Sequence, residues 1–188
     1  MTKKQAAQSD KRQMTSWALA ILLVVVVAIN LAGTAIAQQV GRELAEQERA
    51  NLENFDDLDF NVFTNQKWGE LGRSHAQDII VHWPDGRTTV GIDPHIEDLK
   101  AMFVFAPDTR VTDHPIRIAS GNWTAVTGVM EGTFSKPMPI GEGKTIAPTG
   151  KAFKLSLVTI GRWEGSTLAE EWLFWDNLAL MQQMGLAE

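Results

Sequence analysis

The chain of 188 residues contains no cysteine, and this absence excludes disulfide bonds, thiol catalysis and cysteine-based metal sites. It also lacks a basic stripe, because after residue 37 only 13 basic residues accompany 22 acidic residues, giving a net charge of −9. A domain of this charge repels phosphates, so we expect no nucleic-acid partner. Hydrophobic residues make up 44% of the chain and charged residues 21%, which is typical of a globular protein.

Sequence motifs for metals and phosphates are missing as well. The four histidines, at positions 75, 82, 95 and 114, show neither an H-x-H nor an H-x-x-x-H spacing. Residues 141–144, GEGK, lack the glycine spacing and the following helix of a phosphate-binding loop. We therefore expect neither a metal site nor a cofactor.

The first 37 residues have the pattern of a targeting segment. Four basic residues precede an apolar run over 17–33, and Ala35 and Ala37 form an A-x-A pattern before Gln38. This order is typical of a secretory signal peptide, but residues 17–37 are also about long enough for an uncleaved membrane anchor. Under both interpretations the rest of the chain is exported. We expect it to be periplasmic or extracellular, or anchored by its N-terminus, with membrane contact only through residues 17–37.

The next segments predict helices. Residues 38–58 are polar and rich in helix formers, which favours a helical spacer. Asp93 and Pro94 predict the start of a second helix, with Asp93 as N-cap and Pro94 at the first helical position. That helix is expected to end before Pro107, because the residue before a proline is disfavoured in the helical conformation.

Apolar residues then recur with period two, which predicts four strands over 109–119, 121–134, 151–163 and 167–175. Residues 120–122 and 164–166 are typical of hairpin turns. A short last helix follows, with Asp176 as N-cap and Gly185 just after its end. Helices followed by antiparallel strands predict an α+β domain over 59–188, with a pocket on the concave side of the sheet.

The last predicted strand contains the leading site candidates. Alternate residues of a strand share a face, so one face carries Leu168, Glu170, Trp172, Phe174 and Asp176. If this face lines the pocket, burial raises the pKa of its carboxyl groups toward neutrality, as a general base for a carbon acid requires. Asp176 is the first choice and Glu170 the second. Asp176 as a mere helix cap remains open, and one residue can serve both purposes.

Other candidates have plain structural alternatives. His82 can hydrogen-bond a substrate carbonyl or be satisfied by the backbone of its own segment. Trp83 and His114 are expected at the pocket lining, although a core or rim tryptophan and a loop histidine are equally ordinary. His75 and His95 are expected in helices, as surface or packing residues.

Several stretches resemble the SnoaL-like polyketide cyclases, also called ester cyclases, of the nuclear-transport-factor-2-like superfamily. They are DIIVHWPDG (78–86), FAPDTRV (105–111), GNWTAVTGVMEGTF (121–134), PTGKAF (148–153), IGRWEGSTLAEEWLFWD (160–176) and MQQMG (181–185). The resemblance implies a cone-shaped curved antiparallel sheet packed against N-terminal helices, with an apolar pocket and a short C-terminal helix. It also implies a homodimer formed through the sheet.

The resemblance places Asp176 at the family's aspartate and His82 at a family histidine. It implies an intramolecular aldol ring closure in which a pocket acid removes a proton without metal or cofactor. The predicted export is a departure, because these cyclases act in the cytoplasm beside the synthase. Two functions are therefore carried forward: acid–base chemistry on a small carbonyl compound, and a non-catalytic module that binds an apolar small molecule or a second copy.

Overall fold

The computed structural model describes residue 31 and residues 33–188, so the predicted segment 17–37 lies mostly outside the described residues. Within the described part of the chain, no helix is both long enough and apolar enough to cross a membrane. Contacts divide the chain into two compact units, Met1–Ala45 and Glu46–Glu188. In the first unit, residues 33–45 are helical and exposed. The second unit carries the cavity described below.

The second unit begins with a helix that continues to residue 57. The π-helix η1 (Leu58–Phe63) and the 3-10 helix η2 (Trp68–Arg73) follow it directly, and two α-helices come later, α2 (Ile92–Phe105) and α3 (Asn177–Met184). The strands are β1 (His75–His82), β2 (Thr88–Val90), β3 (Arg110–Asp113), β4 (Arg117–Ser120), β5 (Trp123–Thr133), β6 (Met138–Pro139), β7 (Thr145–Ile146), β8 (Ala152–Glu164) and β9 (Thr167–Trp175).

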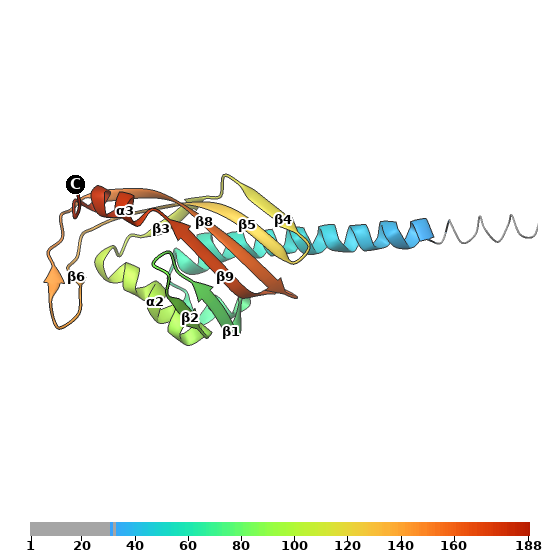
Figure 1. Ribbon diagram of the computed structural model, residues 1–188, viewed down its shortest axis with the longest axis horizontal. Coiled ribbons are helices and arrows are strands. Elements are labelled where there is room, and N and C mark those ends of the chain that lie inside the picture. Colours follow the sequence, from blue (N-terminus) through green and yellow to red (C-terminus); the bar gives the residue numbers. More distant parts are fainter. Residues whose placement is uncertain (1–30, 32) are drawn as a thin grey trace, which may run out of the picture. The chain divides into compact units, whose positions relative to one another are not determined.

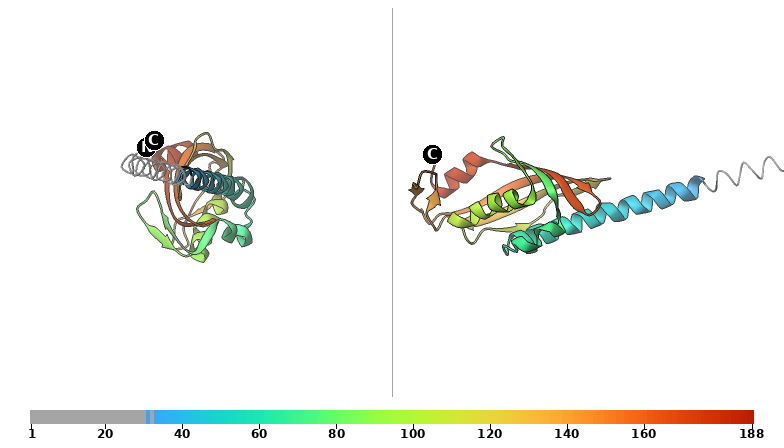
Figure 2. Two further views of the ribbon diagram at one scale, coloured as in Figure 1. Left: turned by 90° about the vertical axis from the view of Figure 1, so that its right-hand side faces the viewer. Right: turned by 90° about the horizontal axis from the view of Figure 1, so that it is seen from below.

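Seven strands form one curved sheet in the order β2-β1-β9-β8-β5-β3, with β4 also paired to β5 (Figure 1). All neighbours are antiparallel except β1 and β9, which run parallel. Helix α2 lies along one face of this sheet (Figure 2). The predicted α+β class is confirmed: an N-terminal helix precedes the sheet, the sheet is curved without closing, and a short helix ends the domain. Helix α2 lies between β2 and β3 in the chain, so two strands precede it.

Local sequence signals explain the turns and the ends of helices. Gly121 and Gly165 have φ angles of 59° and 63° in the β4–β5 and β8–β9 turns, a backbone conformation that glycine adopts without steric cost. Gly185, with φ 77°, ends α3 in the left-handed conformation as predicted. Helix α2 ends at Phe105, two residues before Pro107, also as predicted.

Three local predictions are corrected by the structure. Helix α2 starts one residue before Asp93, with Gly91 as N-cap, so Asp93 lies in the first turn, where its charge favours the helix dipole. His75 begins strand β1 rather than lying in a helix. The segment 109–119 forms two strands, β3 and β4, because His114 and the residues up to Ile116 leave the sheet between them.

The core consists of two clusters on the inner face of the sheet. One contains Phe55, Val81, Trp163 and Leu168, and the other contains Met130, Phe134 and Phe153 among others. Asn51 and Phe55 are buried as well. The helix over 46–57 therefore packs against the domain core, although it precedes residue 59, the predicted start of the domain. The two clusters hold the strands that line the cavity.

Gly161 tests this packing. A Cβ at Gly161 would collide with Leu168 and lie 3.0 Å from the Thr124 hydroxyl, which accepts a 2.9 Å hydrogen bond from Trp163 Nε1. We expect Gly161→Ala to lower the free energy of unfolding by about 1–3 kcal/mol, because overpacking a buried strand displaces its neighbours. Urea denaturation measures this change.

Gly69→Ala is the matched control, because a Cβ at Gly69 meets nothing within 4 Å. Its free energy of unfolding should change by no more than about 0.5 kcal/mol. Equal stability of the two variants would contradict the packing described here.

Candidate functional site

A cavity of about 320 Å³ lies between the inner face of the sheet and the helices α2 and η1. Most of its lining is apolar, with Phe63, Met102, Phe105, Met130 and Leu157 among the contributors. Seven titratable side chains also line it: His75 from β1, His95 from α2, Glu171 from β9, Asp59 from η1, and in addition Asp85, Arg87 and Asp98. An apolar cavity with a few convergent polar groups is the usual form of a small-molecule site.

A β-bulge in β9 determines which acid faces this cavity. Trp163 of β8 pairs with Leu168, while the preceding Arg162 pairs with Glu170, so Ala169 is an extra residue on β9. Leu168 and Glu171 therefore both point inward although they are three residues apart. Beyond the bulge, the inward residues are Glu171, Leu173 and Trp175.

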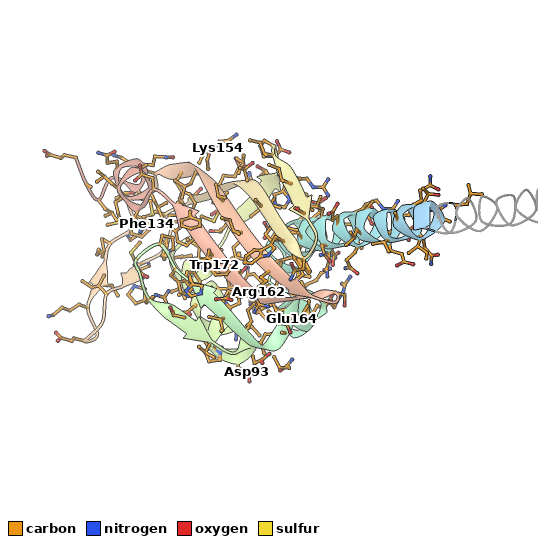
Figure 3. The ribbon with its side chains drawn as sticks, turned by 45° about the vertical axis from the view of Figure 1, so that its right-hand side comes forward. Asp93, Phe134, Lys154, Arg162, Glu164 and Trp172 are labelled. Carbon is orange, nitrogen blue, oxygen red and sulfur yellow. The ribbon has the colours of Figure 1, made fainter. Side chains whose placement is uncertain are left out.

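The predicted inward face of β9 is corrected accordingly. Simple alternation from the buried Leu168 assigned Glu170, Trp172 and Phe174 to the pocket, but none of the three lines the cavity. Instead they share the outer face of the sheet, where Figure 3 shows Trp172 and Arg162 on the β8–β9 part. The extra residue reversed the face of every position after it.

His82 and Glu170 form a surface pair on this outer face. His82 Nε2 lies 2.8 Å from Glu170 Oε1, and the His82 ring stacks on Trp172 with centroids 4.9 Å apart. The hydrogen bond from His82, with help from Arg162, lowers the pKa of Glu170. The expected rise of this pKa does not occur, because the carboxylate is paired rather than desolvated.

Asp176 caps helix α3 and does not line the cavity. Its Oδ1 accepts a 2.9 Å hydrogen bond from the Ala179 backbone N–H, in the geometry of an N-cap. The helix cap considered as an alternative for Asp176 is therefore present. An acid–base role for Asp176 and His82 stays a prediction.

His75, His95 and Glu171 form a buried cluster at the cavity. Glu171 Oε1 lies 3.3 Å from His95 Nε2 and 3.7 Å from His75 Nε2, and all three residues are at most 3% exposed. Burial lowers the pKa of His95 to about 4 against the attraction of Glu171, so this ring is neutral at neutral pH. Burial alone would raise the pKa of Glu171, but the two histidines outweigh it and the pKa is lowered.

Asp59 belongs to a second polar chain that reaches the cavity from η1. Asp59 Oδ2 lies 2.9 Å from His114 Nε2, and His114 Nδ1 lies 2.8 Å from Asp56 Oδ1. Arg117 completes the chain, with Nη2 2.8 Å from Asp56 Oδ2. His114 itself is buried behind Asp59 and does not line the cavity, in contrast to its predicted place.

The pKa shifts in this chain have distinct causes. Burial raises the pKa of Asp59, and the hydrogen bond and charge of His114 offset this only in part. Burial would lower the pKa of His114, but its bonds to Asp59 and Asp56 raise it instead. Asp59 is thus a cavity carboxyl group with an elevated pKa, held by a histidine that favours its charged form.

Trp83 lines the cavity near a charged network at its rim. Trp83 Nε1 donates a 2.9 Å hydrogen bond to Thr89, whose hydroxyl donates to Asp98. Arg87 stacks over the Trp83 ring, 4.4 Å from its centroid, and pairs with Asp98 at 2.7 Å. These contacts fix the indole at the rim.

The fold and the site can now be compared with known proteins. The family model described as SnoaL-like polyketide cyclase matches residues 56–184. The chain belongs to the SnoaL-like polyketide cyclase family. A comparison with curated protein sequences finds no significant match.

Solved structures of polyketide cyclases and of a nuclear-transport-factor-2-like protein have a similar fold. IdmH from Streptomyces antibioticus is 21% identical with a TM-score of 0.61, covering 72% of this chain and 98% of its own. A SnoaL-like protein from a Jannaschia species is 19% identical with a TM-score of 0.63, covering 76% and 96%. A nuclear-transport-factor-2-like protein from Burkholderia pseudomallei is 17% identical with a TM-score of 0.58, covering 72% and 97%. At these low sequence identities the structural similarity establishes the fold alone, so the chemistry has to be argued from the cavity.

Sequence reasoning did not select Asp59, His75, His95 or Glu171. A signal existed for His95, which lies four residues before Leu99 and seven before Met102, on the same stripe of α2. His75 lies on the same face of β1 as the buried Ile79 and Val81. The expected helix around His75 concealed this alternation. Nothing in the local sequence revealed the bulge that turns Glu171 inward.

Removal of the α3 cap provides a test of Asp176. We expect Asp176→Ala to lower the free energy of unfolding by about 1 kcal/mol, because the Ala179 N–H loses its acceptor. Asp176→Asn is the control and should retain nearly full stability, since asparagine caps equally well. Chemical denaturation of both variants measures the difference, and an Ala variant as stable as the Asn variant would rule out the cap.

Proposed function

We propose that this protein binds a small, largely apolar carbonyl compound and catalyses proton transfer on it, in a reaction of the aldol cyclisation or isomerisation type. The observation that carries this proposal is Asp59, a carboxyl group of raised pKa in an apolar cavity. Membership of the SnoaL-like family supports the same class of reaction. Action outside the cytoplasm, expected from residues 1–37, remains part of the proposal.

Asp59 has the properties of a general base for a carbon acid. The proton next to a carbonyl group is weakly acidic, and a carboxylate accepts it more readily when its own pKa is raised. His114 engages Oδ2, which fixes the carboxylate and leaves Oδ1 outside that bond. Asp59 then removes the proton, and in its neutral form returns it to the enolate carbon or to the newly formed alkoxide.

The buried cluster is the natural partner for the carbonyl oxygen. An enolate develops negative charge on this oxygen, and catalysis requires a group that stabilises the charge there. His75 and His95 line the same cavity as Asp59, so both rings are available to a substrate held inside it. Trp83 and Arg87 line the cavity too, at the rim.

Replacement of Asp59 tests the proposal. We expect Asp59→Asn to slow deuterium exchange at the acidic carbon of small β-keto esters in D₂O by at least about 100-fold, the usual contribution of a general base. Proton NMR of a panel of such esters measures the exchange with the full chain. Glu170→Gln is the matched control, because this acid lies on the outer face.

Two outcomes would contradict the proposal. Exchange at the wild-type rate in Asp59→Asn would exclude Asp59 as the base. Saturable binding of the esters with no exchange in the wild-type protein would instead support the non-catalytic binding module.

The pH dependence provides a second test. A base acts when it is deprotonated, so exchange should rise with pH through an inflection above the usual aspartate pKa, since burial raises the pKa of Asp59. His114 lowers this pKa in part, so His114→Gln, which keeps an amide donor but no charge, should move the inflection to higher pH. An unmoved or lowered inflection would show that His114 does not tune Asp59.

A further inference from the structure

The geometry of the buried cluster points to a metal site: we infer that His75, His95 and Glu171 bind one divalent first-row transition ion, of which Zn²⁺ is the best match. The three side chains come from β1, α2 and β9 and offer ligand atoms that all lie within 4.8 Å of one another. Because the ligands come from three separate elements, no local sequence motif marks the site.

The distances suit a common ion. Ligand atoms bound to one tetrahedral ion at roughly 2.0–2.1 Å lie about 3.4 Å from each other. Glu171 Oε1 lies 3.3 Å from His95 Nε2 and 3.7 Å from His75 Nε2. The 3.7 Å contact is too long for a hydrogen bond, so a hydrogen bond does not account for the approach of His75 to Glu171.

The hydrogen bonds of His75 orient it as a ligand. Ser74 Oγ donates to the Leu71 carbonyl at 3.1 Å, and the same oxygen lies 2.9 Å from His75 Nδ1. The hydroxyl proton is used on Leu71, so His75 Nδ1 carries the proton and donates it to Ser74. The lone pair of His75 Nε2 then faces Glu171, as in metal-bound histidines whose remote nitrogen is held by an outer partner.

His95 is buried without ordinary polar partners. Its Nδ1 has no hydrogen-bond partner among the described residues, and its ring is 1% exposed. Buried polar groups in native proteins are nearly always satisfied. The other ring nitrogen, Nε2, faces Glu171 Oε1 at 3.3 Å, so the ring presents to the cluster the nitrogen that would bind an ion.

The charge of the cluster favours a cation. Glu171 is 3% exposed, and its ion-pair partners within the described chain are the two histidines alone, with no lysine or arginine. A carboxylate buried without a lysine or arginine is costly, and a divalent ion offsets this cost. Two imidazoles and one carboxylate are also the ligand set of open zinc sites and of non-haem iron sites.

The cluster lines the cavity, so the remaining coordination positions are accessible to a ligand within it. A bound ion there would polarise a carbonyl oxygen in the same cavity as Asp59. This role rests on the proposed function, whereas occupancy of the site by metal does not.

Metal binding is measured on the full chain after treatment with a chelator and dialysis. We expect calorimetry with Zn²⁺ to show one ion per chain. Co²⁺ bound at the same site should give the visible absorption bands of a site of low coordination number. Glu171→Gln and His75→Gln should each weaken Zn²⁺ binding by at least about 100-fold, since removal even of outer partners weakens metal sites by 10–100-fold. His82→Gln and Glu170→Gln are matched controls from the same two strands, but on the outer face, and should bind as the wild type does.

X-ray absorption of the Zn²⁺-loaded wild type needs no variant and should show imidazole nitrogens at about 2.0–2.1 Å. No saturable Zn²⁺ binding, or binding lost in the outer-face variants and kept in Glu171→Gln, would overturn the site. Metal binding without carbon-acid exchange would leave the site intact and reject the proposed function. Exchange that is unaffected by a chelator, in a protein that binds no Zn²⁺, would reject the metal site and leave the proposed function intact.

Discussion

The bulge at Ala169 places one extra residue in β9, and the composition of the cavity depends on it. Without the bulge, Glu170 would follow the buried Leu168 inward, and Glu171 would join the solvent-exposed face. With it, Glu171 meets His75 and His95, while Glu170 pairs with His82 and Arg162 outside. The same strands thus carry two histidine–glutamate contacts on opposite faces, one buried and one solvated.

Burial separates the chemistry of these two contacts. On the outer face, water and Arg162 share the charge of Glu170, so the pair is an ordinary surface interaction of small energetic weight. On the inner face, the Glu171 charge has no such partners, and every contact acts through a medium of low dielectric constant. A structural feature of a single residue therefore decides whether a carboxylate on β9 is solvated or acts in the cavity.

The ends of several helices could be predicted from the sequence because they depend on the backbone preferences of single residues. Gly185 and Asp176 mark the ends of α3, and Pro107 limits α2, each through its own backbone preference. The inward face of β9 could not be predicted in the same way, because a bulge arises from pairing with β8 and leaves no local signature. The partners of Asp59 were equally hidden, since His114 lies 55 residues further along the chain. The later strands and the last helix could therefore be predicted, while β1, β2 and the inward face of β9 could not.

Asp59 and Glu171, two acids that line the cavity, differ in what their histidines do. His114 is itself held by Asp56, which raises its pKa and favours its charged form, and Asp59 still retains a raised pKa. A carboxyl group of raised pKa accepts a proton more readily than an ordinary aspartate does. Glu171 instead faces two rings, one of which is held neutral by burial, and its own pKa is lowered, so it stays charged. In the proposed reaction these two carboxylates have different tasks: Asp59 removes the proton of the carbon acid, and Glu171 holds the proposed metal ion at the carbonyl oxygen.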